Sequence, residues 1–439
     1  MRHRLSGLLA VLSAALLLSA TPTPATAQTR AQAPVRAVYG GVISTDNPLR
    51  AIGSKLPSTF TAAVPPAMPS PPALNQAREN AAKVLPTQAP IPAGLQAAAA
   101  PPHSTPFVTV KYCRDTYGEE DGAMALDRYN WCAMRPSVVY YIDEEGQVQG
   151  TTTFRMVTAG RGDKGSRKAF FTSEFDRFQD SGVVLPAALV TLQLSYSTSG
   201  YSDTDGSNPA CGVVGNSPAT VANWRAGQAA VFEINSNKED GYTPDKVSRC
   251  SVAQLGRSDL NAGWAQLQQT NIRADSSAYL GVTGAVIFSD KMPAMWDYSK
   301  SSPTHGEVAR HIWDAQFQPG TTYPPKTGKT IPGSISSLRQ LHRAANVVWD
   351  LEAYNRYRDN ETAKNKACAA LAPGGTPVGK QCDEYPFRST MEGAGLGDGN
   401  YSVRYVSESH NNTAGQLLAT WYQDERILNR EGFFVAIGS

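Results

Sequence analysis

The six cysteines of this chain, at positions 113, 132, 211, 250, 368 and 382, constrain its fold more than any other sequence feature. An even number of cysteines without a C-x-x-C pair favours disulfide bonds over a zinc site or a redox motif. Joining neighbours along the chain, one of several possible connectivities, predicts the pairs Cys113–Cys132, Cys211–Cys250 and Cys368–Cys382. The last pair closes a loop rich in Gly and Pro, so this crosslink would restrict the unfolded chain and help to fix the residue that follows, Asp383.

The N-terminus has the pattern of an export signal. A basic start at residues 2–4 precedes an apolar run at residues 5–18, and an Ala-Thr-Ala sequence ends at Ala27. These features are typical of a secretory signal peptide over residues 1–27. No later stretch approaches the roughly 20 apolar residues that a transmembrane helix needs. We therefore expect a secreted, extracellular protein without a membrane span.

Two regions of different composition follow this leader. Residues 28–106 are dominated by Ala, Pro, Ser and Thr, which predicts a disordered linker or a pro-segment, with one short helix at residues 75–84. In residues 107–275, short β-branched and aromatic runs alternate with turn residues. The expected strands lie at residues 107–112, 137–142, 151–157, 189–196 and 229–234. This spacing predicts an antiparallel sandwich or barrel, a β-rich accessory domain of unknown function.

The third region, residues 276–439, has an α+β pattern. Its expected strands lie at residues 284–288, 401–407 and 432–437. Its expected helices lie at residues 306–315, at residues 334–370 with a break near 359–360, and at residues 414–422. The sequence therefore predicts a multidomain protein, with a sandwich-like N-terminal domain and an α+β C-terminal domain.

The densest group of potentially catalytic side chains lies in the third region. It comprises the stretch Cys-Asp-Glu-Tyr-Pro-Phe at residues 382–387 and the Met-Glu-Gly at residues 391–393. Asp383, Glu384 and Glu392 place three carboxylates within ten residues, in a chain with only 18% charged residues. Three carboxylates this close can hold a hard divalent cation or transfer protons. The alternative is a solvated acidic turn, because acidic side chains mostly lie exposed.

Four sequence blocks occur in order around this stretch. They are Gly-Glu-Val-Ala-Arg-His-Ile at residues 306–312, Leu-His-Arg at 341–343 with Asn-Lys-Ala-Cys at 365–368, the acidic stretch with Ser-Thr at 389–390, and Val-Arg-Tyr-Val-Ser at 403–407 with Asn411 and Gly415. In this pattern the chain resembles the secreted NucA/NucB family of bacterial deoxyribonucleases, over about residues 280–439. It departs from the family pattern at Arg388, His410 and Ala414, where the family usually carries a small residue, an acid and Gln.

The resemblance implies a fold of the ββα-metal type, in which a strand pair and a helix hold one divalent ion at a phosphodiester. It implies Mg²⁺ as the cofactor, with Mn²⁺ as the alternative, and carboxylate and amide oxygens suit such ions. Asn411 is then the expected metal ligand, with Glu392 and Asp383 as further ligands, although Asn411 can equally be a helix N-cap. Asp383 also stands where such nucleases place their general base. The adjacent Glu384 either raises the pKa of Asp383 or faces away from it on a strand.

Three further residues belong to the expected site. Glu307 lies four residues before His311 on one face of a predicted helix, so the two act together at the site or form an ordinary packed pair. In an active site, His311 would polarise water, donate a proton to the leaving group or orient Glu307. Arg404 alternates with Val403 and Tyr405 on a predicted strand, and either contacts phosphate or lies solvated.

Together these features predict a secreted, monomeric, metal-dependent endonuclease that hydrolyses phosphodiester bonds of DNA. The competing hypothesis is an exported binding or surface protein whose nuclease-like domain is catalytically inactive. The β-rich domain is a candidate to bind a cell-envelope or carbohydrate ligand. The formal net charge of +2 is too small to decide whether the chain binds nucleic acid.

Overall fold

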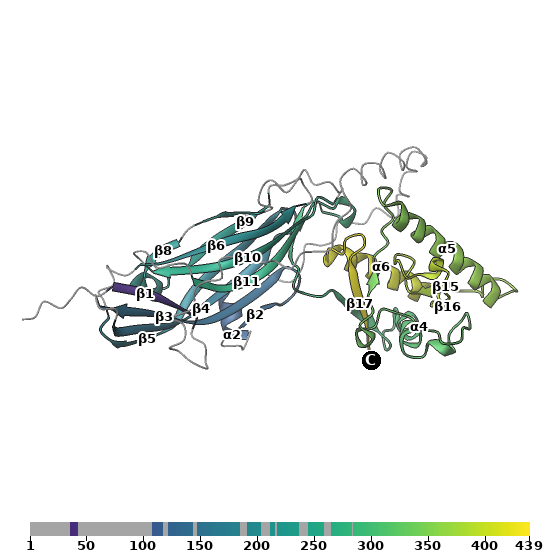
Figure 1. Cartoon of the computed structure of the whole chain (residues 1–439). Helices are drawn as coiled ribbons and strands as arrows, with labels where there is room; N and C mark the ends of the chain where they lie inside the picture. The colour runs from purple at the N-terminus through teal and green to yellow at the C-terminus, as the bar shows by residue number, and fades with distance from the viewer. Residues whose placement is uncertain are drawn as a thin grey trace, which may run out of the picture.

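The computed structural model of the chain describes residues 36–42, 108–116, 122–143, 147–184, 191–202, 211–215, 217–236, 245–258, 265–282 and 284–439. Long antiparallel strands dominate the part of the molecule up to Phe288, and helices with short strands dominate the part after it (Figure 1). The structure is therefore β-rich with a C-terminal α/β region. The expected signal peptide and the expected helix at residues 75–84 lie outside the described residues.

Two antiparallel sheets make up the β-rich region and share one hydrophobic core. The first has the order β1 (Arg36–Val42), β3 (Asn130–Ile142), β4 (Val148–Gly162), β5 (Lys168–Gly182), β9 (Ala230–Asn235) and β7 (Gly212–Val214), with β2 (Gly122–Ala125) beside β3. The second has the order β12 (Ala285–Phe288), β11 (Ala265–Asp275), β10 (Ser248–Ser258), β6 (Thr191–Ser202) and β8 (Ser217–Thr220). Trp131, Phe171 and Phe288 bring aromatic rings from both sheets into contact in this core.

Short helices join some of these strands, namely α2 (Val110–Thr116), α3 (Val221–Arg225) and η4 (Ala278–Leu280). The strand expected at residues 107–112 is wrong, because the chain forms α2 from Val110 onward. Cys113 of this helix is bonded to Cys132 of β3, and both are fully buried. Tertiary packing and the crosslink therefore outweigh the local β propensity.

The β-rich region extends beyond both limits expected from the sequence. Residues 36–42, within the expected linker, form β1 and pair with β3 from Arg36↔Ile142 to Val42↔Ser137. At the other end, β12 pairs with β11 from Asp275↔Ala285 to Ile272↔Phe288. The second sheet thus continues past residue 275, because the chain turns through η4 and returns as an entirely buried strand.

The C-terminal region contains two small sheets and three helices. One sheet has the order β13 (Ala294–Ser299), β17 (Gly432–Gly438) and β14 (Leu341–His342), and the other pairs β15 (Lys380–Tyr385) with β16 (Ser402–Ser407). The helices are α4 (Gly306–Phe317), α5 (Leu351–Leu371) and α6 (Glu408–Asp424), with the short turns η5 (Pro319–Thr321), η6 (Ile335–Ser337) and η7 (Ala394–Leu396). Figure 1 shows the β15–β16 pair between α4 and α5.

The helix expected over residues 334–370 is only partly present. It begins at Leu351, where the Asp350 side chain accepts a hydrogen bond from the Ala353 amide as an N-cap. The preceding residues form η6 and then β14, which pairs with β17. The expected break near residues 359–360 does not occur, because Asn360 lies fully buried within α5.

The β15–β16 pair has two different faces because side chains alternate along a strand. Asp383 and Arg404 lie opposite each other and contact residues of α4. Cys382 and Tyr405 also lie opposite each other, and they contact Cys368 of α5. The acid at position 383 is therefore turned toward α4 and its neighbours in sequence toward α5.

Three disulfide bonds are present, and they join Cys113 to Cys132, Cys211 to Cys250 and Cys368 to Cys382. Their Cα–Cα distances are 5.5, 6.3 and 6.2 Å, within the usual range for such bonds. These are the pairs of sequence neighbours expected above. In the described part of the chain, no helix combines the length and the apolar character needed to cross a membrane.

Candidate functional site

Asp383 lies in a buried chain of hydrogen bonds with a histidine and a serine. Its Oδ2 lies 2.7 Å from Nδ1 of His311 on α4, and Nε2 of the same ring lies 2.7 Å from Oγ of Ser402 on β16. The His311 side chain is 0% exposed, whereas that of Asp383 is 11% exposed. His311 is therefore placed to orient Asp383 through its Oδ2 atom.

Arg404 lies beside Asp383 on the α4 face of the strand pair. Its guanidinium forms an ion pair with Asp314 of α4 at 2.7 Å, and 35% of its side chain is exposed. A pocket of about 380 Å³ opens here, and its lining includes Arg404, Lys300 and Arg310. Glu307 and Asp314 also line this pocket, and the ion pair with Asp314 holds Arg404 in place.

Glu384 points to the opposite face, toward α5. Burial raises the pKa of its carboxyl to about 8, an effect that the charge of Lys364 opposes and that of Asp383 reinforces. Its Oε2 is buried without a hydrogen-bond partner among the described residues. Of the two arrangements expected for Glu384, the strand geometry selects the one in which it faces away from Asp383.

Glu392 binds His342, a histidine to which the sequence analysis assigned no role. Oε1 of Glu392 lies 2.8 Å from Nδ1 of His342, and Oε2 accepts a hydrogen bond of 2.8 Å from the backbone amide of His342. The hydrogen bond to Glu392 raises the pKa of the His342 imidazole, although burial acts in the opposite sense. Both carboxylate oxygens of Glu392 thus have a defined partner, and the His342 side chain remains 45% exposed.

A buried asparagine fixes the loop that carries Glu392. The side chain of Asn360 on α5 donates to the carbonyls of Arg388 and Thr390 and accepts from the amide of Gly395, each at 2.8 Å. These three bonds join the loop after β15 to the middle of α5. Asn360 was missed from the sequence, because a polar residue at a helix-interior position carries no sign of which loop it meets.

Glu307 and His311 share α4 but have separate partners. Glu307 accepts hydrogen bonds from the Ser407 amide at 2.8 Å and from Nζ of Lys380 at 3.0 Å. The Ser407 amide, followed by Lys380, lowers the pKa of the Glu307 carboxyl. Glu307 therefore joins α4 to the ends of β15 and β16, whereas His311 contacts Asp383 within the strand pair.

Asn411 lies in the first turn of α6, and the helix N-cap is Ser407. Its Nδ2 donates to Oε1 of Gln381 on β15 at 3.0 Å. A pocket of about 490 Å³ opens at this point, and its lining includes Asn411, Gln381, Lys364 and Lys380. The N-cap alternative is thus wrong, and the amide oxygen of Asn411 stays close to a polar pocket between α5, β15 and α6.

The comparisons with known proteins assign this region. Residues 340–436 match the family model described as deoxyribonuclease NucA/NucB. Over these residues the chain is similar to the NucA/NucB family. No curated protein and no solved structure matched the chain. The matched NucA/NucB segment contains Asp383, Glu384, Glu392, Arg404 and Asn411, whereas α4 with Glu307 and His311 lies before it.

The oxygen donors of the NucA/NucB segment suit a hard cation, although they are not gathered into a cluster. Within the described ranges, no group of three or more His, Cys, Asp or Glu side chains could hold a metal ion. A Mg²⁺ site does not require such a group, because Mg²⁺ usually takes one or two protein carboxylates and keeps several waters. The Oδ1 of Asp383, the unpartnered Oε2 of Glu384 and the amide oxygen of Asn411 are all donors of the kind that Mg²⁺ prefers.

Ser402 is a second site residue that sequence reasoning missed. It stands two residues before Arg404 and therefore on the same face of β16. That period of two could have placed Ser402 beside Asp383 once the strand pairing was known. The contact with His311 depends on the position of α4, which no local pattern specifies.

Proposed function

We propose that the chain is a secreted, metal-dependent endonuclease that hydrolyses the phosphodiester bonds of DNA. The observation that carries this proposal is the NucA/NucB match over residues 340–436, which coincides with β15, β16 and α6 and with the loop between the two strands. These elements carry Asp383, Glu392 and Asn411. The order strand, strand, helix also supports the proposal that this segment is of the ββα-metal type.

The proposed roles follow from the partners of each side chain. Asp383 is the general base or a metal ligand through Oδ1, and His311 with Ser402 holds it in one orientation. Asn411 and Glu392 are the further proposed ligands, and Arg404 is the proposed phosphate contact beside Asp383. A divalent ion bound through one or two of these oxygen donors would neutralise the phosphate oxygens and lower the pKa of a bound water.

Glu384 and Glu307 have different proposed parts in the same reaction. Glu384 acts from the α5 face, where its buried, unpartnered oxygen can hold a proton or take part in cation binding. Glu307 acts through position, because it fixes α4 against the ends of the strand pair and so places His311.

Secretion is supported by the three disulfide bonds, since such bonds persist in oxidising compartments outside the cytoplasm. It agrees with the signal-peptide pattern at residues 1–27. We further propose that the mature protein acts as a monomer and that Mg²⁺, or Mn²⁺ in its place, is the working cofactor.

The test compares variants of the mature, disulfide-bonded chain on plasmid DNA. Asp383→Asn and Glu392→Gln should each lower the cleavage rate by about 100-fold or more, the usual scale for loss of a catalytic acid or base. The matched control is Glu352→Gln, which removes an acid of the same region that is 69% exposed and whose partner, Arg430, keeps its second ion pair with Asp350. It should leave the rate within about twofold, as expected for an exposed ion pair of little energetic weight.

Two results would contradict the proposal. Full cleavage by a folded double variant, Asp383→Asn with Glu392→Gln, would remove both residues from the site. Binding of DNA by the wild-type protein that needs no metal and produces no cleavage would favour the competing hypothesis, an exported binding protein with an inactive nuclease-like domain.

A further inference from the structure

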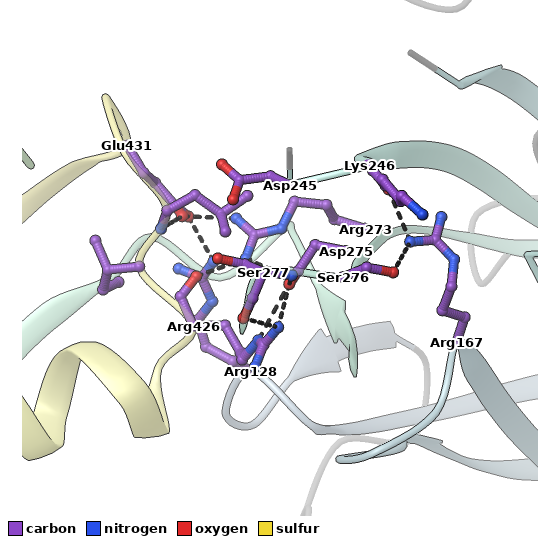
Figure 2. A network of polar contacts seen from close by, with 12 residues as sticks. Arg128, Arg167, Asp245, Lys246, Arg273, Asp275, Ser276, Ser277, Arg426 and Glu431 are labelled. Atoms are coloured by element: carbon purple, nitrogen blue, oxygen red, sulfur yellow. Dashed lines mark hydrogen bonds and ion pairs between the residues drawn. The ribbon is translucent and has the colours of Figure 1, made fainter. Parts of the chain in front are cut away.

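A network of buried charges joins the β-rich region to the loop that connects α6 with β17 (Figure 2). This connecting loop comprises residues 425–431. Arg128, before β3, forms an ion pair with Glu431 at 2.5 Å, and Arg273 of β11 forms another with Glu431 at 2.6 Å. Asp275, also on β11, pairs with Arg426 of the loop. The side chains of Asp275 and Arg426 are both 0% exposed.

The contacts of this network stabilise one conformation of the connecting loop. Arg273 also donates to the backbone carbonyl of Arg426 at 2.6 Å, and Arg426 donates to the carbonyl of Val282 at 2.7 Å. Glu431 accepts from the amide of Leu428 at 2.8 Å within the loop itself. Removal of one partner would leave a buried charge uncompensated, so these contacts strongly disfavour other arrangements of the loop.

The backbone of the connecting loop needs such support. Arg426 and Arg430 have φ angles of 48° and 67°, in the left-handed region that non-glycine residues rarely adopt. Strain of this kind persists where surrounding contacts over-determine the conformation. For Arg426, those contacts come from Arg273, Asp275 and Val282 of the β-rich region.

The connecting loop in turn holds the segment that contains β14. The Arg343 amide donates to the Glu431 carbonyl at 3.0 Å, and the Arg430 amide donates to the Arg343 carbonyl at 2.8 Å. The Ala345 amide donates to Oδ1 of Asn429 at 2.9 Å. One side of residues 341–345 is therefore paired with the loop that the β-rich region supports.

The other side of residues 341–345 holds Glu392. His342 binds both oxygens of Glu392 through its ring and its amide, as described above. The amide of Met391 donates to the His342 carbonyl, and the amide of Ala344 donates to the Ser389 carbonyl, each at 2.8 Å. A series of hydrogen bonds, linked by short stretches of backbone, thus leads from Arg128 and Arg273 to Glu392.

We propose that the β-rich region positions Glu392 through the connecting loop and residues 341–345, and that Arg128, Arg273 and Asp275 are positioning residues of the nuclease. This inference rests on the proposed function in so far as Glu392 acts in catalysis. It gives the β-rich region a role inside the enzyme. The C-terminal region depends on it for an ordered site, because the charges of Arg426 and Glu431 are compensated across the junction.

The test uses Arg128→Met in the full mature chain, with Lys164→Met as its matched control. Lys164 forms an ion pair across the same junction, with Asp424 at 3.0 Å, but it does not contact the connecting loop in that pair. Both changes remove one cation of the β-rich region. Only Arg128→Met removes support from Glu431.

Two measurements on these variants test whether the β-rich region positions Glu392. Amide hydrogen exchange in residues 341–345 and 389–392 should become at least about tenfold faster in Arg128→Met and stay unchanged in Lys164→Met, since it reports local opening. The DNA cleavage rate kcat should fall by about tenfold with KM nearly constant, within the roughly hundredfold that misplacement of a catalytic group by 1 Å can cost. Arg128→Lys, which keeps the charge, should restore part of both.

Unchanged exchange in both segments of a folded Arg128→Met protein would overturn the inference, as would an equal change in Lys164→Met. If Arg128→Met does not fold, the milder Arg128→Lys is compared with Lys164→Met by the same criteria. If the wild-type protein does not cleave DNA under any metal, the proposed function fails, and hydrogen exchange still decides whether the β-rich region orders Glu392.

Discussion

Replacement of Gly393 by alanine should disorder the loop that carries Glu392. A Cβ atom at position 393 would lie 2.4 Å from Nδ2 and 2.5 Å from Cγ of Asn360, distances that real Cβ contacts essentially never show. The Asn360 amide is not free to move away, because it makes the three hydrogen bonds that join the loop to α5. Either the loop shifts or these bonds break.

The size of the effect follows from those contacts. Overpacking costs about 1–3 kcal/mol, and each broken hydrogen bond costs about 1 kcal/mol, so we expect Gly393→Ala to lower the free energy of unfolding by about 3 kcal/mol. Gly415→Ala is the matched control, because a Cβ there meets nothing within 4 Å and the residue lies inside α6. This control should be stabilising by up to about 1 kcal/mol through helix propensity.

Urea unfolding of both variants, followed by far-UV circular dichroism, measures the difference, and DNA cleavage measures its consequence. We expect Gly393→Ala to be less active than the wild-type protein even at temperatures at which it is folded, since Glu392 is the adjacent residue. A Gly393→Ala protein as stable and as active as Gly415→Ala would refute the argument that Asn360 fixes this loop.

Three further predictions concern other parts of the molecule. Burial raises the pKa of Asp245 from 3.8 to about 6. The contribution of its protonated carboxyl to the free energy of unfolding is therefore fully present below pH 4 and is lost as the pH rises through 6. Asp245→Asn should stabilise the protein by about 3 kcal/mol at pH 8 and by little at pH 4, as measured by unfolding at both pH values. Joint replacement of Cys368 and Cys382 by serine removes a crosslink between residues 14 apart and should cost about 3 kcal/mol in urea unfolding. His311→Gln removes the ring that orients Asp383 and should lower kcat by about 10–100-fold with a small change in KM, and an unchanged kcat would contradict its positioning role.

Local sequence patterns predicted much of the C-terminal strand and helix arrangement. The alternation in residues 401–407 and the apolar run in residues 432–437 correspond to β16 and β17. The helix around Ala414 is longer than expected and begins at Glu408, directly after β16 ends at Ser407. Elements with a clear period and clear end signals were therefore predictable.

The partners of the site residues were less predictable, because they come from distant parts of the chain. His311 and Asp383 are 72 residues apart, and Arg128 and Glu431 are 303 residues apart. The sequence pattern placed His311 on a helix, but the packing of α4 and of the β-rich region decides which side chains meet. For the same reason, the pairing expected between Glu307 and His311 on one helix face gave way to separate partners.

The central claim is that this NucA/NucB region cleaves DNA with the help of a divalent cation, and a metal titration of the purified mature protein tests it most directly. Cleavage of plasmid DNA should stop in EDTA and return when Mg²⁺ or Mn²⁺ is added in excess, while Asp383→Asn stays inactive at every metal concentration. Cleavage that continues unchanged in EDTA, or that Asp383→Asn performs as well as the wild-type protein, would contradict the account.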